Sequence, residues 1–223
     1  MAKISETSGR QDENSGYSRI LGNPRLGHLI SRVHATTIRA GTELEHLLEA
    51  STPSARKSSL GDSIRLAKRL EGKGVRVVFA PKIKKTKGKR GTIGDLLVFN
   101  HKDRAITLIE LKDGDTFDTK KASGELQSLK AASKRFAKRT GYKSTFRFCS
   151  FNQNDKNAII AGAKKRFTPD QVMTGRELCG ILKIDYDSFV GARKQEQAAN
   201  LQYLLRELMA IPELAERLQR MFR

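Results

Sequence analysis

Apolar side chains recur every three to four positions over several stretches, the spacing that places them on one face of a helix. One or two helices are predicted between Leu26 and Leu48, and a short basic helix is predicted around Leu66. Thr174 and Glu177 have the spacing of a capping box, which indicates that a helix starts there. The later helices are predicted at Ser123–Arg139, at Thr174–Leu182, at Gln195–Met209 and after Pro212.

Runs rich in Val, Ile, Leu and Phe predict strands. These runs are Val75–Pro81, Asp95–Phe99, Ile106–Lys112, Ser144–Phe151 and Asn157–Ala161. The segment from Met1 to about Tyr17 has almost no large apolar residue, and its composition is typical of a disordered arm. The remaining residues, 18–223, are predicted to form one domain, because their number suits a single core.

The composition adds a strong positive charge. The chain has 43 Lys and Arg residues against 24 Asp and Glu residues, a formal net charge of +19. Cationic side chains that neutralise phosphates release condensed counterions, so nucleic acid is the first candidate partner. The alternatives are a merely soluble basic surface and an anionic membrane, but no apolar run reaches the roughly 18 residues of a membrane helix. With no signal-peptide core either, the sequence predicts a soluble, cytoplasmic protein.

The strongest candidate chemistry lies where two predicted strands meet. Pairing Phe99 with Ile106 in a hairpin places Asp95 opposite Glu110, about 5 Å away on the same face of the sheet. Lys112 lies two positions past Glu110 and points to that same face. Two carboxylates and one ammonium group are therefore expected at one end of the hairpin. The alternative interpretation is a surface ion-pair cluster.

Two carboxylates this close would repel by about 3 kcal/mol at an effective dielectric constant near 20, so a positive charge is expected between them. Magnesium fits, because it takes hard oxygen ligands and keeps water positions open for a phosphate. We place Asp95, Glu110 and Leu111 in this metal site, and Lys112 would orient a water molecule or stabilise developing negative charge. The other Glu-x-Lys tripeptide, 71–73, follows no apolar strand and lacks this context.

The sequences GDLLVF (94–99) and TLIELKDGD (107–115) resemble the core of the PD-(D/E)xK nucleases, and type II restriction endonucleases in particular. The resemblance covers about 37–151, and Gly94 stands where the name of the motif has Pro. It implies an α/β fold with a mixed central sheet flanked by helices. The sheet is expected to be complete near residue 151, with further helices in the C-terminal additions, 152–223.

The same resemblance implies that Asp95 and Glu110 are metal ligands and that Lys112 is the catalytic lysine. Family members often carry another Glu on the helix before the first strand, and here Glu43 and Glu45 are the candidates. Glu45 is the better one, because it adjoins the apolar stripe of its helix. A solvated helix glutamate is the alternative.

Two basic runs are candidates for contacts with phosphate. One lies between two predicted strands, and the other lies further along the chain, so each could follow a nucleic-acid backbone. Solvated loops are the alternative interpretation of such charge runs. The candidate DNA-binding residues are Lys82, Lys84, Lys85, Lys87, Lys89, Arg90, Lys164 and Lys165.

Together these observations predict a magnesium-dependent endonuclease that cuts double-stranded DNA at specific sequences as a homodimer. A Holliday-junction resolvase with the same three active-site residues is the alternative enzyme. A basic DNA-binding protein without catalysis, whose acidic pair is structural, is the alternative outside enzymes. No functional role is predicted for Cys149 and Cys179, because they lack metal-ligand spacing and are expected to be buried apolar fillers.

Overall fold

The computed structural model describes residues 2–10, 15–84, 90–92, 94–114 and 119–221. Contacts divide the chain into two compact units. The first unit combines Met1–Leu44 with Asp187–Arg223, and the second unit is Glu45–Tyr186. The single domain over 18–223 stays a prediction, and the sequence shows no linker at either boundary between these units.

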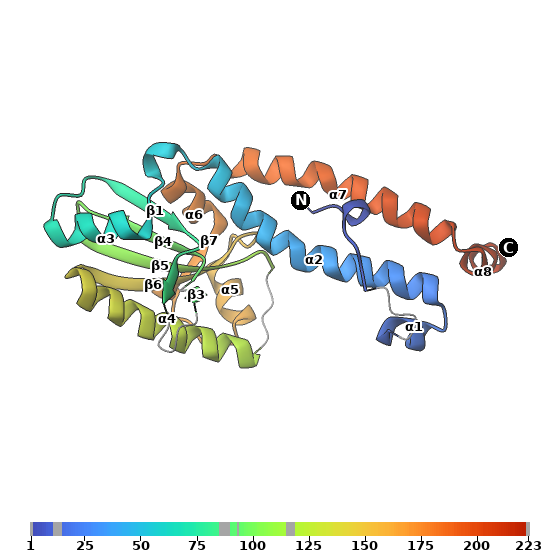
Figure 1. Ribbon diagram of the computed structural model, residues 1–223. Helices are drawn as coiled ribbons and strands as arrows, with labels where there is room; N and C mark the ends of the chain where they lie inside the picture. The colour runs from blue at the N-terminus through green and yellow to red at the C-terminus, as the bar shows by residue number, and fades with distance from the viewer. Residues whose placement is uncertain (1, 11–14, 85–89, 93, 115–118, 222–223) are drawn as a thin grey trace. The chain divides into compact units, whose positions relative to one another are not determined.

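The second unit is built on a five-stranded mixed sheet with the strand order β1-β4-β5-β6-β7 (Figure 1). Strands β1, β4 and β5 pair antiparallel, whereas β5, β6 and β7 pair parallel. The predicted α/β class and mixed sheet are therefore confirmed. The strands are β1 (Val75–Phe79), β2 (Lys82–Lys84), β3 (Arg90–Thr92), β4 (Leu96–Asn100), β5 (Ala105–Lys112), β6 (Lys143–Ser150) and β7 (Val172–Thr174), of which β2 and β3 form a separate antiparallel pair.

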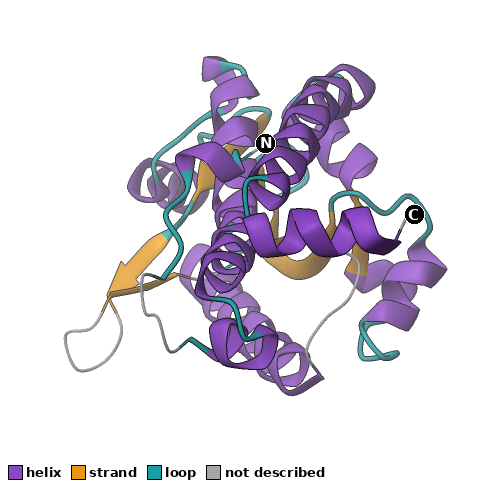
Figure 2. Cartoon of the chain, turned by 90° about the vertical axis from the view of Figure 1, so that its right-hand side faces the viewer, coloured by secondary structure: helices purple, strands orange, loops and turns teal. Residues whose placement is uncertain are grey.

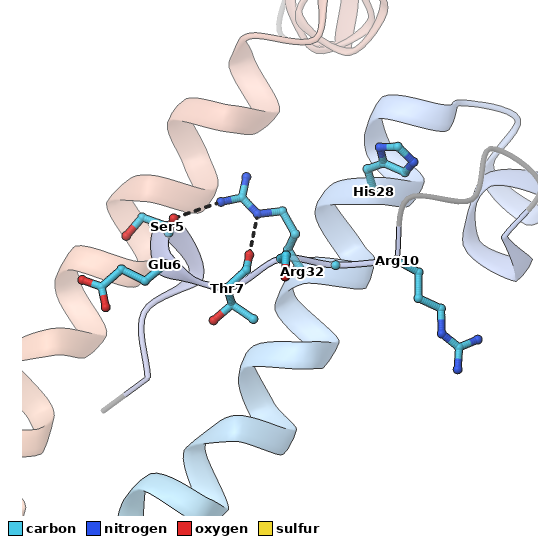
Figure 3. Close-up of a pocket in the computed structure, with 8 residues that line it drawn as sticks. Ser5, Glu6, Thr7, Arg10, His28 and Arg32 are labelled. Atoms are coloured by element: carbon cyan, nitrogen blue, oxygen red, sulfur yellow. Dashed lines mark hydrogen bonds between the residues drawn. The ribbon is translucent and has the colours of Figure 1, made fainter.

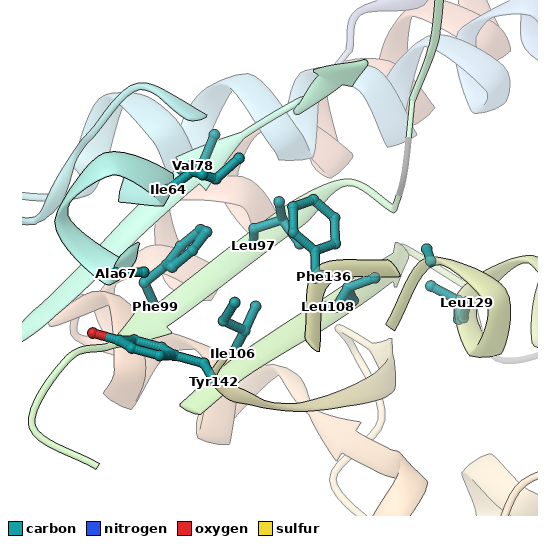
Figure 4. Packing of buried hydrophobic residues seen from close by; sticks show 11 residues of the cluster. Ile64, Ala67, Val78, Leu97, Phe99, Ile106, Leu108, Leu129, Phe136 and Tyr142 are labelled. Atoms are coloured by element: carbon teal, nitrogen blue, oxygen red, sulfur yellow. The ribbon is translucent and has the colours of Figure 1, made fainter. Parts of the chain in front are cut away.

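One face of the sheet carries a large cluster of buried apolar side chains, contributed by β1, β4 and β5 and by two helices (Figure 4). Leu97 and Phe99 of β4 and Ile106 and Leu108 of β5 alternate along their strands and are fully buried. Each such side chain contributes about 1.5–3 kcal/mol on burial. Helices α3 (Leu60–Arg69) and α4 (Thr119–Thr140) supply the other side of the cluster, and α4 is also the crossover that joins parallel strands β5 and β6.

The hairpin register predicted from the sequence is confirmed over the regular part of β4 and β5. Phe99 pairs with Ile106, and Leu96 pairs with Ile109. The predicted helix start at Thr174 is also confirmed. The Thr174 side chain accepts a hydrogen bond from the Glu177 N–H at 3.2 Å, and the Glu177 carboxylate accepts one from the Thr174 N–H at 2.9 Å.

Two predictions beyond Phe151 differ from the structure. The strand predicted at Asn157–Ala161 is wrong, because this segment lies in helix α5 (Lys156–Gly162). Asp155 caps the helix, and Ile159 and Ala163, one helical turn apart, are buried against β6 and β7. The sheet also continues past residue 151, since β7 pairs with β6 and is followed by α6 (Gly175–Leu182). The unit also contains η2 (Ser54–Arg56) and η3 (Pro169–Gln171).

All strands that the structure describes belong to the second unit, and the first unit is helical (Figure 2). The first unit is formed by η1 (Ile4–Glu6), α1 (Gly16–Leu21), most of α2 (Pro24–Ser51) and α7 (Tyr186–Met209), and α8 (Pro212–Met221). Within the described residues, no helix is long and apolar enough to span a membrane.

Arg32 of α2 holds the N-terminal segment (Figure 3). Its guanidinium donates to the carbonyl oxygens of Thr7 at 3.1 Å and of Ile4 at 3.0 Å. The Ile4 N–H donates to the Asn200 side chain at 2.9 Å, and Ile4 is buried. Hydrogen bonds with the side chains of Arg32 and Asn200 therefore hold the main chain of this segment, which the sequence analysis assigned to a disordered arm.

Net charge is concentrated in the second unit. This unit contains 31 Lys and Arg residues against 15 Asp and Glu residues, a net charge of +16. The first unit contains 12 against 9, a net charge of +3. The polyanion expected from the composition would therefore be drawn mainly to the unit that contains the sheet.

The capping ion pair of α6 gives a prediction about pH. Burial would raise the pKa of Glu177, but hydrogen bonds from Lys156 and Thr174 and the Lys156 charge outweigh it, so this pKa lies below its ordinary value of 4.5. A carboxyl with a lowered folded-state pKa stabilises the fold above its unfolded pKa and loses this contribution as pH falls through the folded pKa.

We expect Glu177→Gln to lower the free energy of unfolding by roughly 0.5 kcal/mol at pH 7, since both partners are partly exposed. The difference from the native chain should shrink as the pH falls through the lowered folded-state pKa of Glu177, where the carboxylate takes up a proton. Urea unfolding across this pH range measures it. Glu49→Gln, in an exposed helix position of the same unit, is the control. A deficit that persists unchanged at low pH would contradict the assignment.

Candidate active site

Asp95 lies just outside strand β4, where the main chain leaves the regular ladder. Gly94 adopts a left-handed conformation, with φ +67°, and a Cβ at this position would lie 2.9 Å from the Ile109 carbonyl oxygen. The Asp95 N–H donates to that same oxygen at 2.9 Å. The ladder that was predicted to place Asp95 opposite Glu110 therefore ends one residue earlier, at Leu96.

The Asp95 side chain nevertheless reaches strand β5. Its Oδ2 atom accepts a hydrogen bond of 2.6 Å from the main-chain N–H of Leu111. The Asp95 carbonyl oxygen accepts a second bond, from the Ala80 N–H at 2.8 Å, after the end of β1. Asp95 is thus tied to both neighbouring strands, and its carboxylate lies beside the residue that follows Glu110.

Glu110 and Lys112 form a close ion pair at the end of β5. The distance from Lys112 Nζ to Glu110 Oε1 is 2.6 Å, and the two side chains are 31% and 16% exposed. The positive charge that the sequence analysis expected near the two carboxylates is thus supplied in part by Lys112. The structure brings Asp95, Glu110 and Lys112 together at one end of the sheet, as predicted.

Glu45 lies near this group, in the part of α2 that belongs to the second unit. Burial raises the pKa of Glu45 above its ordinary value of 4.5, the charge of Glu110 raises it further, and Lys112 acts in the opposite direction. Of the two glutamates predicted to assist the site, Glu45 therefore interacts electrostatically with Glu110 and Lys112. Glu43 is half-buried and belongs to the first unit.

The last residue of strand β6 and the two residues after it hold Lys112 and the chain that follows it, a role that sequence analysis missed. The Phe151 N–H donates to the Lys112 carbonyl oxygen at 2.8 Å. Ser150 Oγ donates to the Gly114 carbonyl oxygen at 3.1 Å. Asn152 Nδ2 donates to the carbonyl oxygen of Asp113 at 2.6 Å and to its carboxylate at 2.8 Å. No sequence signal identifies these partners, because the register of parallel strands is not set by a short turn.

The candidate DNA-binding residues lie in two separate places. Lys82, Lys84 and Arg90 belong to the paired strands β2 and β3, whereas Lys85, Lys87 and Lys89 lie outside the described residues. Lys164 and Lys165 are exposed in the turn that follows α5, where both have left-handed φ values of 50° and 57°. A left-handed conformation costs a side-chain-bearing residue about 1–2 kcal/mol, so this turn holds two lysines where glycine would fit better.

A known protein aligns with this chain from end to end. The chain is 38% identical to the type II restriction enzyme HhaII of Haemophilus parahaemolyticus over 234 aligned positions, which cover all of both proteins. The chain belongs to the type II restriction enzymes. No family model and no solved structure matches it. In this restriction enzyme the candidate site therefore rests on the geometry of its own residues.

The donor atoms at the site suit a hard cation. Asp95 and Glu110 offer carboxylate oxygens, and Leu111, which lies between Glu110 and Lys112 in sequence, has a main-chain carbonyl oxygen. Mg²⁺ prefers such oxygen ligands. Within the described residues, no group of three or more His, Cys, Asp or Glu side chains is placed to hold a metal ion. A metal here would thus need the carbonyl oxygen or water beside the two carboxylates.

Gly94 provides a test of how Asp95 is placed. We expect Gly94→Ala to lower the free energy of unfolding by about 1–3 kcal/mol, because it combines a positive φ with a close approach to the Ile109 carbonyl. It should also speed hydrogen exchange of the Leu111 amide, as Asp95 shifts. Gly124→Ala in helix α4 meets no atom within 4 Å and should instead raise stability by about 0.5–1 kcal/mol. Unchanged stability and Leu111 protection in Gly94→Ala would contradict this account.

Proposed function

We propose that this restriction enzyme is a magnesium-dependent endonuclease that hydrolyses phosphodiester bonds of double-stranded DNA at specific sequences, as a homodimer. One observation carries the proposal: Asp95, Glu110 and Lys112 converge at one end of the β4–β5 hairpin. The identity of 38% to a type II restriction enzyme over the whole chain supports a site-specific deoxyribonuclease. Hydrolysis of a phosphodiester requires stabilisation of negative charge and an activated water, which this set of groups suits.

Asp95 and Glu110 would hold the metal ion together with the Leu111 carbonyl oxygen. The hydrogen bond from the Leu111 N–H fixes one oxygen of Asp95 and leaves its carboxylate beside Glu110. When bound, Mg²⁺ polarises the phosphoryl oxygen and lowers the pKa of a water ligand. Burial and the charge of Glu110 both raise the Glu45 pKa, and a bound cation would favour its charged form, so Glu45 would assist the metal site.

Lys112 carries a positive charge, so its proposed role differs from that of the metal ligands. Its ammonium group is held beside Glu110, and its side chain is 31% exposed, so the residue remains accessible to substrate. There it would orient the attacking water or stabilise the charge that develops on the phosphate in the transition state. The hydrogen bond from Phe151 to the Lys112 carbonyl oxygen would keep this residue in place at the end of β5.

The second unit would supply most contacts with the DNA backbone, since it carries a net charge of +16. We propose phosphate contacts for Lys82, Lys84 and Arg90 of the β2–β3 pair, for the neighbouring Lys85, Lys87 and Lys89, and for Lys164 and Lys165. Such contacts position the duplex and add affinity without reading its sequence. The strained turn at Lys164 and Lys165 supports this role, because unusual backbone conformations cluster where binding requires them.

We expect Asp95→Asn, Glu110→Gln and Lys112→Ala each to lower the cleavage rate by at least about 100-fold, because each removes a ligand or the positioned cation. DNA binding should remain within a few-fold of the native chain. The assay digests a linear duplex of known sequence with Mg²⁺, and separately a four-way junction. Discrete duplex fragments with a shared end sequence are expected.

Lys73→Ala is the matched control for Lys112→Ala. Lys73 is the exposed lysine of the other Glu-x-Lys tripeptide, and this variant should cut at the native rate. Full activity in chelator, or in any of the three active-site variants, would overturn the site assignment. Cutting of the junction alone would leave the site intact and overturn the proposed substrate.

Lys165 offers a test in which stability and binding move in opposite directions. Lys165→Gly should raise the free energy of unfolding by about 0.5–1 kcal/mol, because glycine adopts the left-handed conformation without steric cost. It should also reduce the slope of log affinity against log salt by about 0.9, the value of one phosphate contact.

Lys183→Gly is the control for this variant. Lys183 is an exposed, left-handed lysine at the end of α6, so its replacement should give the same gain in stability and remove the same charge. Its salt slope should stay at the native value. Equal slopes for all three proteins would show that Lys165 is merely solvated.

A further inference from the structure

The β6–α5 loop, defined as residues 151–155, lies at the same edge of the sheet as the candidate active site. Strands β5 and β6 are parallel, and Lys112 at the end of β5 pairs with Ser150 at the end of β6. In open α/β sheets, ligands bind outside the carboxyl ends of the strands. A substrate held at Lys112 would therefore lie close to the residues that follow Ser150.

The start of this loop is fixed to the active-site strand. The Phe151 N–H donates to the Lys112 carbonyl oxygen at 2.8 Å, and Asn152 Nδ2 donates to the Asp113 carboxylate at 2.8 Å. The Phe151 side chain is fully buried, with its ring centroid 5.6 Å from that of Tyr186. The loop therefore presents its next side chains from a defined position, as specific recognition requires.

The polar side chains of the loop have partners, with one exception. Asn152 is bonded to Asp113, as described above. Gln153 Oε1 accepts from the Asp155 N–H at 3.0 Å, and the Asp155 carboxylate accepts from the N–H that opens α5 at 2.9 Å. Asn154 is exposed, and within the described residues its side-chain amide makes no hydrogen bond. Its donor and its acceptor are both available to a ligand.

A side-chain amide of this kind matches the edge of one base. In the major groove, adenine presents an acceptor at N7 and a donor at its N6 amino group, and Asn can pair with both at once. The candidate phosphate contacts of the second unit are all Lys and Arg, which add affinity without reading sequence. The segment 151–154 carries no charge, so its exposed amide suits a base edge.

We propose that Asn154 reads an adenine of the recognition sequence in the major groove, accepting from N6 at Oδ1 and donating from Nδ2 to N7. This inference rests on the proposed function and deepens it, because it assigns a specificity-determining residue beside the cleavage site. It separates two roles in the second unit: the lysines and Arg90 contact phosphates, and Asn154 recognises one base pair.

The test selects sequences by binding, so it does not depend on cleavage. The full-length chain is mixed with a pool of randomised duplexes, with Ca²⁺ in place of Mg²⁺ because both take oxygen ligands, and the bound duplexes are sequenced. The native chain should enrich one sequence. Asn154→Ala should enrich the same sequence, except that its preference for A at one position, with any symmetric counterpart, falls by about 5- to 150-fold.

Two further variants separate base reading from damage to the loop. Asn154→Asp keeps the size of the side chain but removes the Nδ2 donor, so it should lose the same preference for A. Gln127→Ala is the matched control, because it removes an exposed amide from α4 in the same unit. This variant should enrich the native sequence without change. Circular dichroism of each variant confirms that it is folded.

The pattern of preferences decides the outcome. A native chain that enriches no sequence would overturn the inference, and so would native preferences in Asn154→Ala. Weaker binding with every preference intact would identify a phosphate contact instead, and a loss spread over all positions would identify a structural role. Either result would also overturn base reading by Asn154.

Cleavage of the enriched sequence with Mg²⁺ then separates this inference from the proposed function. If the native chain enriches a sequence through Asn154 and does not cut it, the endonuclease proposal fails and the base contact stands. If the native chain cuts the enriched sequence and Asn154→Ala discriminates as the native chain does, the base contact fails alone.

Discussion

The hydrogen bond between the Leu111 N–H and the Asp95 carboxylate, 2.6 Å long, joins the two strands that carry the candidate active site. It forms where regular pairing of β4 and β5 has ended, so the side chain takes over from the main chain in linking the two segments. A charged acceptor makes such a bond shorter and stronger than a neutral one. Asp95 is thereby held beside Glu110 and Lys112, although it lies outside the strand.

This placement depends on a sheet that cannot shift easily. Leu97, Phe99, Ile106 and Leu108 are fully buried under α3 and α4, and a slip by one residue would turn this entire set to the opposite face. Gly94 permits the change of direction just before Asp95, because a side chain there would meet the Ile109 carbonyl. Burial of these side chains sets the register of β4 and β5. Gly94 allows the main chain to depart from this ladder at Asp95.

The sequence predicted the part of the site that depends on local pairing. A short turn joins β4 and β5, so matching Phe99 with Ile106 was enough to bring Asp95, Glu110 and Lys112 together. The departure of Asp95 from the ladder was not predictable, because it depends on a left-handed Gly94. Pattern alone also misassigned Asn157–Ala161, since a short apolar run fits a buried strand and a buried helical turn equally well.

Non-local pairing set a second limit on prediction. The parallel register that brings Ser150 beside Lys112 follows from the length and course of α4, which sequence spacing does not encode. Similarly, the sequence favoured Glu45 over Glu43 from its place beside the apolar stripe, but the electrostatic interaction of Glu45 with Glu110 needed the structure. The charge total was visible from composition, but its concentration in one unit required knowledge of which segments fold together.

Direct measurement of metal binding tests the central claim of a metal-dependent site at the β4–β5 hairpin. Mn²⁺ takes the same carboxylate, carbonyl and water ligands as Mg²⁺, and its paramagnetic resonance signal weakens on binding. Titrating Mn²⁺ into the protein with uncleavable duplex DNA should show a bound ion, with affinity lower by at least about 10-fold in Asp95→Asn. Asp62→Asn, at an exposed helix position, should bind as the native chain does. Equal Mn²⁺ affinity in Asp95→Asn and the native chain would contradict the account.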